Sequence, residues 1–115
     1  MKKLISLLLL LSILIPAASA ETMPDAYNWY EIFVYSYQDS NGDGIGDLGG
    51  VRQRLDYIAD MGYTGIWFMP IMPSPSYHKY DVTDYKAVDP QYGTMDDFRA
   101  LVQECHDRGI RVIID

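Results

Sequence analysis

The sequence predicts an α/β fold built on a parallel sheet, and three observations support this prediction. Segments with strand and helix patterns alternate along the chain, which is typical of βαβ units. Residues 65–69 and 110–114 are short and almost wholly apolar, as expected of strands that are covered on both faces. The segments after strands are long, whereas those after helices are short. A (β/α)8 barrel and a doubly wound open sheet share this pattern, so periodicity alone leaves both architectures open.

The first expected strand covers residues 29–37, which are rich in aromatic and β-branched residues. A helix is expected next, because apolar residues recur at helical spacing over residues 51–59 and Gly62 is placed to end it. Residues 65–69 form the second expected strand. The chain therefore begins with a strand, helix, strand unit.

A long loop is expected over residues 70–93, which contain four prolines and show no clear period. Thr94 is expected to cap a second helix with Asp97, in a capping box that has Asp in place of Glu. The buried stripe of this helix consists of Phe98, Leu101, Val102 and Cys105. Gly109 ends the helix, and residues 110–114 form the third strand.

The N-terminus has the layout of a secretory signal peptide over residues 1–20. Two lysines precede an apolar run, and the segment ends in a small-x-small site at Ala20, after which we expect cleavage. A membrane anchor is the alternative, but the run is shorter than the ~20 residues that span a bilayer as a helix. We therefore expect a secreted or periplasmic protein with no membrane partner after cleavage, a linker at residues 21–28 and a domain at residues 29–115.

Charge and cysteine content limit the classes of partner. Removing residues 1–20 takes away two of the nine basic residues and none of the 16 acidic ones, which leaves a formal charge of −9. This charge argues against nucleic acid as a partner. Cys105 is the only cysteine, so an internal disulfide is excluded, and its place on an apolar helix face indicates a buried structural residue. The oligomeric state stays open.

The segment after the first expected strand has the spacing of a calcium-binding loop. Oxygen-bearing groups stand at every second position, and Gly44 is at the sixth position. A hard dication prefers roughly six to eight oxygen ligands. The expected ligands are Asp39, Asn41, Asp43, the carbonyl of Ile45, and Asp47, with waters completing the shell. We therefore expect Ca²⁺ as a cofactor that orders this loop.

Two other interpretations of this loop are open. A solvated turn also favours Asn, Asp and Gly, but it does not require an oxygen at every second position. A non-catalytic calcium-binding module of the dockerin type has a similar loop. Such a module would carry an acidic ligand at position 12, where Gly50 stands, and a second copy of the loop. The entering segment also has a strand pattern, whereas an EF-hand enters from a helix.

The expected loop at residues 70–93 combines rings with carboxylates. They are Tyr77, His78, Tyr80, Tyr85 and Tyr92, with Asp81, Asp84 and Asp89 among them. Ring faces bind the apolar faces of ligands and carboxylates accept hydrogen bonds from hydroxyl groups, so a sugar suits such a loop. Aromatic residues also pack loops against the core. Composition leaves ligand contact and structural packing equally open.

Five motifs, in this order, resemble the N-terminal part of the α-amylase family of glycoside hydrolases over residues 30–115. They are YSYQDSNGDGIGDLGG from Tyr35, GIWFMP from Gly65, YHKYDVTDY from Tyr77, YGT from Tyr92 and RVIID from Arg111. The resemblance implies the first three strands and two helices of a (β/α)8 TIM barrel, left incomplete. It also implies retaining hydrolysis of α-glucans such as starch or maltodextrins, and a calcium site in the first loop.

The resemblance implies that Tyr80 stacks beneath the sugar at the cleavage point, with His78 nearby. Lys79 stands where relatives often have Gly, which puts the local backbone in doubt. Asp115 matches the first residue of a motif at the end of the family's third strand. The family's catalytic carboxyl groups lie on later strands, so we assign no catalytic residue and expect an inactive fragment of a longer enzyme. A sugar-binding module without hydrolysis is the remaining alternative.

Overall fold

The computed structural model describes residues 26–115. Its elements, in chain order, are β1 (Trp29–Ile32), α2 (Val34–Tyr37), α3 (Leu48–Arg52), α4 (Leu55–Asp60), β2 (Gly65–Phe68), α5 (Met95–Asp107) and β3 (Arg111–Ile114). The strands form one parallel sheet in the order β1-β2-β3, as the alternating pattern predicts. The expected signal peptide at residues 1–20 and most of the expected linker at residues 21–28 lie outside the described residues.

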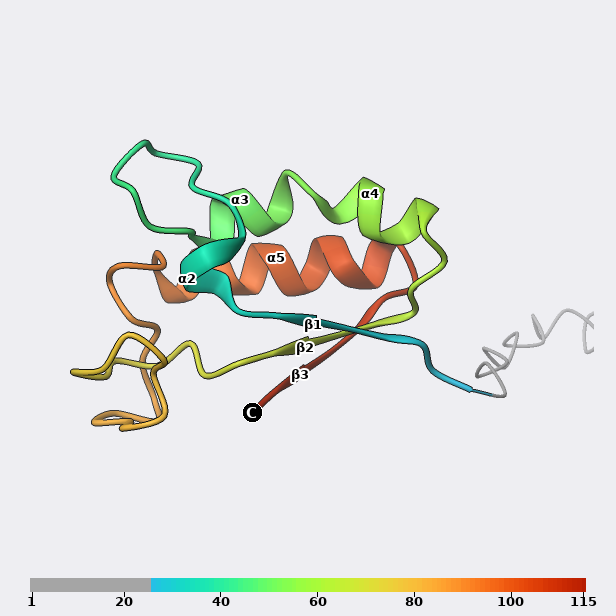
Figure 1. The fold of residues 1–115 in the computed structure, drawn as a ribbon. Helices are drawn as coiled ribbons and strands as arrows, with labels where there is room; N and C mark the ends of the chain where they lie inside the picture. The colour runs from blue at the N-terminus through green and yellow to red at the C-terminus, as the bar shows by residue number, and fades with distance from the viewer. Residues whose placement is uncertain (1–25) are drawn as a thin grey trace, which may run out of the picture.

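The two faces of the sheet differ in what covers them. Helices α3, α4 and α5 lie together on one side of the strands (Figure 1). Ile66 and Phe68 face these helices and are fully buried, whereas Trp67, on the opposite face, is 39% exposed. Trp29 and Ile113 share that exposed face by strand register. One covered face and one uncovered face are what an isolated sector of a closed barrel presents.

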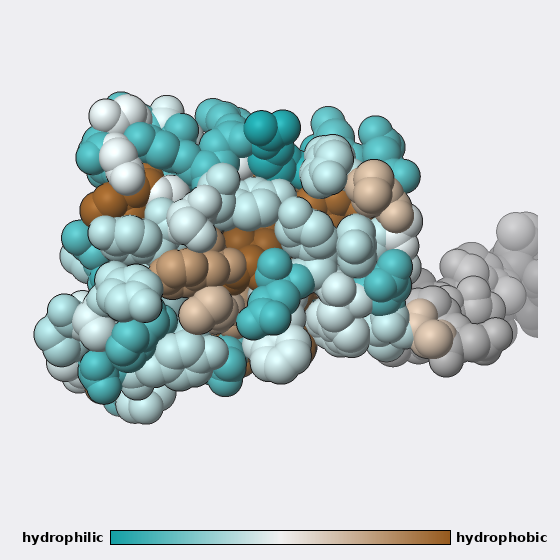
Figure 2. Space-filling model, viewed as in Figure 1, coloured by the Kyte–Doolittle hydropathy of each residue, from teal (hydrophilic) through white to brown (hydrophobic). Residues whose placement is uncertain are grey.

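The core lies between the helices and the sheet. Figure 2 shows hydrophobic residues between the helix layer and the strands, with hydrophilic residues on the outer side of the helices. The buried core residues are Ile32, Val34, Leu48, Val51, Leu55, Ile58, Ile66, Phe68, Ile71, Val88, Tyr92, Leu101, Cys105 and Ile110. Within residues 26–115, no helix is both long enough and apolar enough to cross a membrane.

The prediction of a strand over residues 29–37 is wrong beyond Ile32, because the chain turns there into the short helix α2. Val34 packs into the core and is 1% exposed. The Tyr35 carbonyl accepts a hydrogen bond from the Gly46 amide at 2.8 Å, so the following loop folds back on α2. A Cβ at Gly46 would stand 2.0 Å from the Val34 carbonyl oxygen, which explains why this close approach needs glycine.

The helix expected over residues 51–59 is divided into α3 and α4. Helix α3 begins earlier than the apolar spacing indicates, because the side chain of Asp47 caps it. At the division the Arg54 amide donates to the Val51 carbonyl at 2.9 Å, as in a tighter 3₁₀ turn. Gly62 follows α4 with a φ of 85°, in the left-handed conformation expected of a helix stop.

Helix α5 confirms the most detailed local prediction. The Thr94 side chain accepts from the Asp97 amide and the Asp97 side chain accepts from the Thr94 amide, which is the predicted capping box. Of the predicted stripe, Leu101 and Cys105 are fully buried, and Phe98 and Val102 are half-buried. Burial raises the pKa of the Cys105 thiol to about 12, so this cysteine is a buried structural residue, as predicted.

Candidate functional site

The first candidate site is the acidic loop between α2 and α3. Its side chains accept hydrogen bonds from amides a few residues further along the chain, in a series of Asx turns. Asp39 accepts from the amides of Asn41, Gly42 and Gly44 at 3.0, 2.7 and 2.8 Å. The Asn41 side chain accepts from the Asp43 amide, and Asp43 from the Ile45 amide, each at 2.9 Å. The predicted ligand residues are therefore ordered by hydrogen bonds within the loop itself.

Gly42 and Gly44 give this loop its sharp curvature. Their φ angles are 84° and 91°, in the region that L-residues rarely adopt. Both glycines place their amides within reach of the Asp39 carboxylate. Hydrogen bonds from the Gly44 and Gly42 amides lower the pKa of Asp39, which keeps this exposed carboxyl ionised.

Asp47 has a second role that sequence reasoning missed. Its Oδ1 accepts from the Ser40 hydroxyl at 2.6 Å and from the Gly50 amide at 2.6 Å, which caps α3. Its Oδ2 accepts from the Ser40 amide at 3.0 Å. Burial raises the pKa of Asp47, but the hydrogen bonds from Ser40 and Gly50 outweigh it, so the net pKa is lowered. Asp47 therefore joins the two ends of the acidic loop.

Gly50 occupies the position where an EF-hand has its bidentate Glu, and the structure gives a reason for this departure. A Cβ on Gly50 would stand 1.8 Å from the Gln38 carbonyl oxygen. The start of α3 thus packs directly on the backbone that enters the loop. No side chain at this position fits without moving that backbone, which argues against the geometry of a dockerin-type module.

The chemistry of the donor set fits a hard cation. Asp39, Asn41, Asp43 and Asp47 offer carboxylate and amide oxygens, and Ile45 offers its carbonyl. Within residues 26–115, no ion pair with a basic side chain balances these three carboxylates. In that same part of the chain, no three His, Cys, Asp or Glu side chains converge as a metal-binding group. A site here therefore depends on the Asn41 amide and the Ile45 carbonyl, and the calcium assignment stays a prediction.

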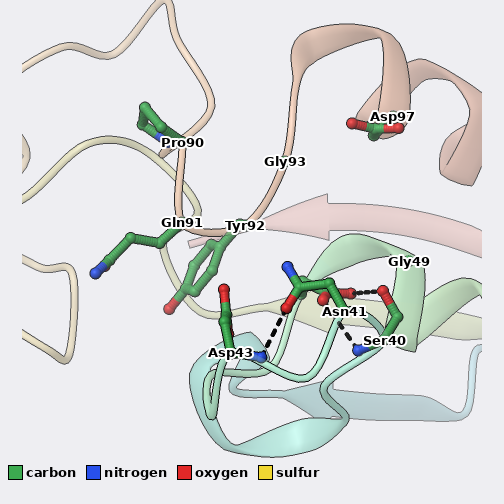
Figure 3. A pocket seen from close by; sticks show the side chains of 10 residues that line it. Ser40, Asn41, Asp43, Gly49, Pro90, Gln91, Tyr92, Gly93 and Asp97 are labelled. Atoms are coloured by element: carbon green, nitrogen blue, oxygen red, sulfur yellow. Dashed lines mark hydrogen bonds between the residues drawn. The ribbon is translucent and has the colours of Figure 1, made fainter.

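The acidic loop borders a hollow that it shares with the end of the second loop (Figure 3). Asn41 and Asp43 lie next to each other in this view and face the segment that carries Gln91 and Tyr92. Tyr92 is 1% exposed, and the Leu48 amide donates to its backbone carbonyl at 2.9 Å. The first and second loops are therefore in contact beside the predicted calcium ligands.

The second candidate site is a run of rings at the edge where β1 and β2 end. Phe33 and Tyr35 stack with centroids 5.8 Å apart, and Tyr77 packs edge-on against both. The run continues from Tyr77 to His78 at 5.4 Å and from His78 to Tyr80 at 5.9 Å. Tyr77 is 66% exposed and Tyr80 is 49% exposed. The structure thus brings together the two predicted substrate-binding residues, His78 and Tyr80, at an accessible aromatic surface.

Tyr80 reaches the end of the third strand. Its hydroxyl donates to Oδ2 of Asp115 at 2.7 Å, and this hydrogen bond raises the pKa of the Tyr80 phenol. The Asp115 amide donates to the Phe68 carbonyl at 2.8 Å, which fixes Asp115 beside the end of β2. The ring therefore lies at the carboxyl edge of the sheet, where the working face of a (β/α)8 barrel is found.

His78 is held by short-range contacts. Its Nδ1 lies 3.2 Å from the Ser76 hydroxyl and accepts from the Tyr80 amide at 3.2 Å. Its Nε2 lies 4.0 Å from a carboxylate oxygen of Asp81. The imidazole is thus oriented by residues on both sides of it in the chain, and its position depends on the backbone between His78 and Tyr80.

The other polar residues of the second loop separate into two groups. Asp81, Asp84 and Tyr85 are exposed, and Tyr85 is 77% exposed. Asp89 is 5% exposed, and its Oδ2 lies 2.7 Å from the Nζ of Lys79. Asp89 is therefore a buried structural partner, which decides for this residue between the ligand contact and the structural packing that composition left equally open.

Lys79 is the residue whose role sequence reasoning missed. Its φ is 68°, a left-handed conformation that glycine adopts without strain and that a residue with a side chain rarely adopts. For a residue with a side chain, this left-handed conformation costs roughly 1–2 kcal/mol. Lys79 is nevertheless 2% exposed, and besides Asp89 it donates to Oε1 of Gln91 at 2.6 Å. The only signal in the sequence was the unusual lysine in an otherwise matching motif.

Comparisons with known proteins identify this arrangement. The family model described as the α-amylase catalytic domain matches residues 31–115. Alpha-amylase 3 of Dictyoglomus thermophilum is 51% identical over 87 residues, which cover 76% of this chain and 17% of that protein. Probable oligo-1,6-glucosidase 2 of Bacillus subtilis is 53% identical over 87 residues, which cover 75% of this chain and 16% of that protein.

Solved structures give the same result. Eubacterium rectale Amy13B matches with a TM-score of 0.75 and 67% sequence identity, over 76% of this chain and 17% of that one. The chain thus spans 16% to 17% of the length of these relatives. The chain belongs to the α-amylase family of glycoside hydrolases, and its three parallel strands and their helices are part of the TIM barrel of that family's catalytic domain.

Proposed function

We propose that this chain is the N-terminal part of the catalytic barrel of a secreted, retaining glycoside hydrolase that acts on α-glucans such as starch and maltodextrins. Membership of the α-amylase family supports the reaction class. The relatives include both an α-amylase and a probable oligo-1,6-glucosidase. The proposal therefore names α-glucans as the substrate class and leaves the linkage open.

The observation that carries this proposal is the position of Tyr80. Its ring is half exposed at the carboxyl edge of the sheet, and its hydroxyl is hydrogen-bonded to Asp115 at the end of β3. A ring fixed at its polar end presents a face against which a sugar ring stacks. We assign Tyr80 to stacking at the cleavage point and His78, 5.9 Å away between centroids, to hydrogen bonding with the same sugar.

The acidic loop has a supporting role in this proposal. Asp39, Asn41, Asp43, the Ile45 carbonyl and Asp47 would hold Ca²⁺. The ion would supply charge neutralisation and order, not chemistry on the substrate. The loop contacts Tyr92 through α3, so its order supports the second loop, which carries Tyr80.

The 115 residues alone are proposed to lack hydrolytic activity. Retaining hydrolysis needs a carboxylate nucleophile and a carboxylic acid about 5–5.5 Å apart. In the family that this chain belongs to, those groups are expected on strands beyond residue 115. The expected signal peptide at residues 1–20 supports export, to the periplasm or to the medium.

The test uses the full-length protein that the gene encodes, assayed with maltooligosaccharides. We expect Tyr80→Ala to lower kcat/KM by about a hundredfold or more, because a misplaced or lost positioning contact has effects of this size. Tyr85→Ala is the matched control, since Tyr85 is a more exposed tyrosine of the same loop. Equal activity of the two variants, or hydrolysis of β-linked instead of α-linked glucans, would overturn the proposal.

A further inference from the structure

We propose that Lys79 is a positioning residue for Tyr80: its buried ammonium anchors the second loop so that the Tyr80 ring is held at the sugar-binding edge. This inference rests on the proposed function for its substrate, because it assigns Lys79 a part in α-glucan binding. The claim that Lys79 fixes the segment carrying Tyr80 does not depend on the substrate, because it is argued from the contacts of the loop alone.

The backbone at Lys79 sends neighbouring side chains in opposite directions. Lys79 is 2% exposed, whereas Tyr80, the next residue, is 49% exposed. The left-handed φ of 68° at Lys79 produces this change of direction. A glycine adopts the same φ without strain, so the conformation alone does not require lysine. The turn alone therefore does not account for the lysine side chain.

The ammonium group of Lys79 has three partners in a buried site. It lies 2.7 Å from Oδ2 of Asp89, 2.6 Å from Oε1 of Gln91 and 5.3 Å from the centroid of the Tyr92 ring. Charge pairing, hydrogen bonding and a cation–π contact thus all act on one buried group. Removing the lysine would leave the Asp89 carboxylate buried without its partner.

The partners of the ammonium group are themselves hydrogen-bonded to the sheet and to a helix, so they form a fixed point for the loop. The Asp89 amide donates to the Ile71 carbonyl at 2.8 Å, directly after β2. The Tyr92 amide donates to the Asp89 carbonyl at 2.8 Å, and the Tyr92 carbonyl accepts from Leu48 at the start of α3. Lys79 therefore joins the outer part of the second loop to the end of a strand and to the start of a helix.

Few other contacts hold the part of the loop around Tyr80. Within the described residues, this segment is otherwise tied to the rest of the chain by the Tyr80–Asp115 hydrogen bond, by the two bonds from Thr83 to the Pro73 carbonyl and by the edge-on packing of the exposed Tyr77 ring against two rings of the first loop. Tyr80 and Asp115 are both exposed at that bond, so water competes with it. The buried Lys79 anchor is the contact that water does not reach.

The first measurement is hydrogen exchange of the full-length protein without ligand, read in peptides covering residues 76–83. Lys79→Met keeps the apolar stem and loses the charge, and Lys79→Gly also relieves the left-handed backbone. Lys86→Met is the matched control, because Lys86 is exposed in the same loop. We expect hydrogen exchange to be about tenfold faster in both Lys79 variants and unchanged in the control. Unchanged exchange in Lys79→Gly would overturn the inference.

The second measurement is the Kd for maltoheptaose in the same proteins. We expect Lys79→Gly to bind about tenfold more weakly than wild type. If Lys79 acts through Tyr80, Lys79→Gly adds no further loss in a Tyr80→Ala background, because the two effects are then non-additive. Additive losses, or faster exchange with unchanged affinity, would show that Lys79 only supports the loop and would overturn the positioning role.

The two measurements separate failure of this inference from failure of the proposed function. If the wild type binds no maltoheptaose, the proposed substrate class fails, and the role of Lys79 in α-glucan binding fails with it. The exchange rates then still decide whether Lys79 fixes the Tyr80 segment. If the wild type binds and the Lys79 variants bind equally well, the proposed function stands and this inference fails.

Discussion

The two loops that leave the sheet at the same edge are held in opposite ways. In the acidic loop, the side chains of Asp39, Asn41 and Asp43 accept hydrogen bonds from amides no more than five residues away. In the second loop, the decisive contacts are a buried ion pair between Lys79 and Asp89 and a hydrogen bond from Tyr80 to β3. Local turns thus shape the predicted metal site, whereas distant partners shape the predicted sugar site.

An Asp→Asn substitution made in each loop should give the largest difference in the free energy of unfolding. Asp89→Asn leaves the Lys79 ammonium buried without a negative partner, and we expect a loss of about 3–5 kcal/mol in the free energy of unfolding. Asp39→Asn removes an exposed carboxylate whose partners are backbone amides, so we expect a much smaller loss in the presence of a chelator. Urea unfolding of the full-length protein, followed by tryptophan fluorescence, measures both. Similar losses would contradict the contrast between the loops.

The difference between the loops also explains how far the sequence predicts this structure. The strands at residues 65–68 and 111–114 and the capping box of Thr94 follow from short-range patterns, and all three are confirmed. The acidic loop belongs to this class, because each of its turns lies within a few residues.

The features that sequence reasoning missed depend on packing. Helix α2 replaces the predicted end of the first strand, because the acidic loop folds back on Tyr35. Lys79 finds Asp89 ten residues away across a loop that has no periodicity. No local pattern reports that a lysine is buried, or which carboxylate it meets. The aromatic run from Phe33 to Tyr80 likewise joins residues of two different βα loops.

The next largest effect is expected from Ca²⁺ binding to the acidic loop. If Ca²⁺ binds the acidic loop, a calcium concentration of about 100 times Kd should stabilise the full-length protein by about 2.7 kcal/mol. Asp43→Asn should abolish this gain, because it removes a charged ligand while keeping the oxygen that accepts from the Ile45 amide. Asp60→Asn, at an exposed position in α4, is the control. Thermal unfolding in calcium and in chelator reports the result, and equal gains in both variants would refute the ligand set.

The smallest effect concerns Asp47, which belongs to the acidic loop and also caps α3. Its pKa is lowered in the folded state, so its contribution is fully present above the unfolded value of about 3.9 and is lost as pH falls through the folded pKa. Loss of an N-cap side chain costs about 1 kcal/mol. Asp47→Ala should therefore lower the free energy of unfolding by about that amount at pH 6 in chelator, and by less at pH 3.

Asp47→Asn separates the charge of this residue from its capping oxygen. Asn keeps an acceptor for the Gly50 amide at the start of α3, so most of the capping energy should remain at pH 6. It has no carboxyl group to protonate, so its free energy of unfolding should fall less steeply than that of the wild type below about pH 4. Parallel curves for the two proteins over this range would mean that Asp47 does not titrate with folding. In that case the acidic loop would owe its stability to hydrogen bonds alone, and its carboxylates would serve the cation rather than the fold.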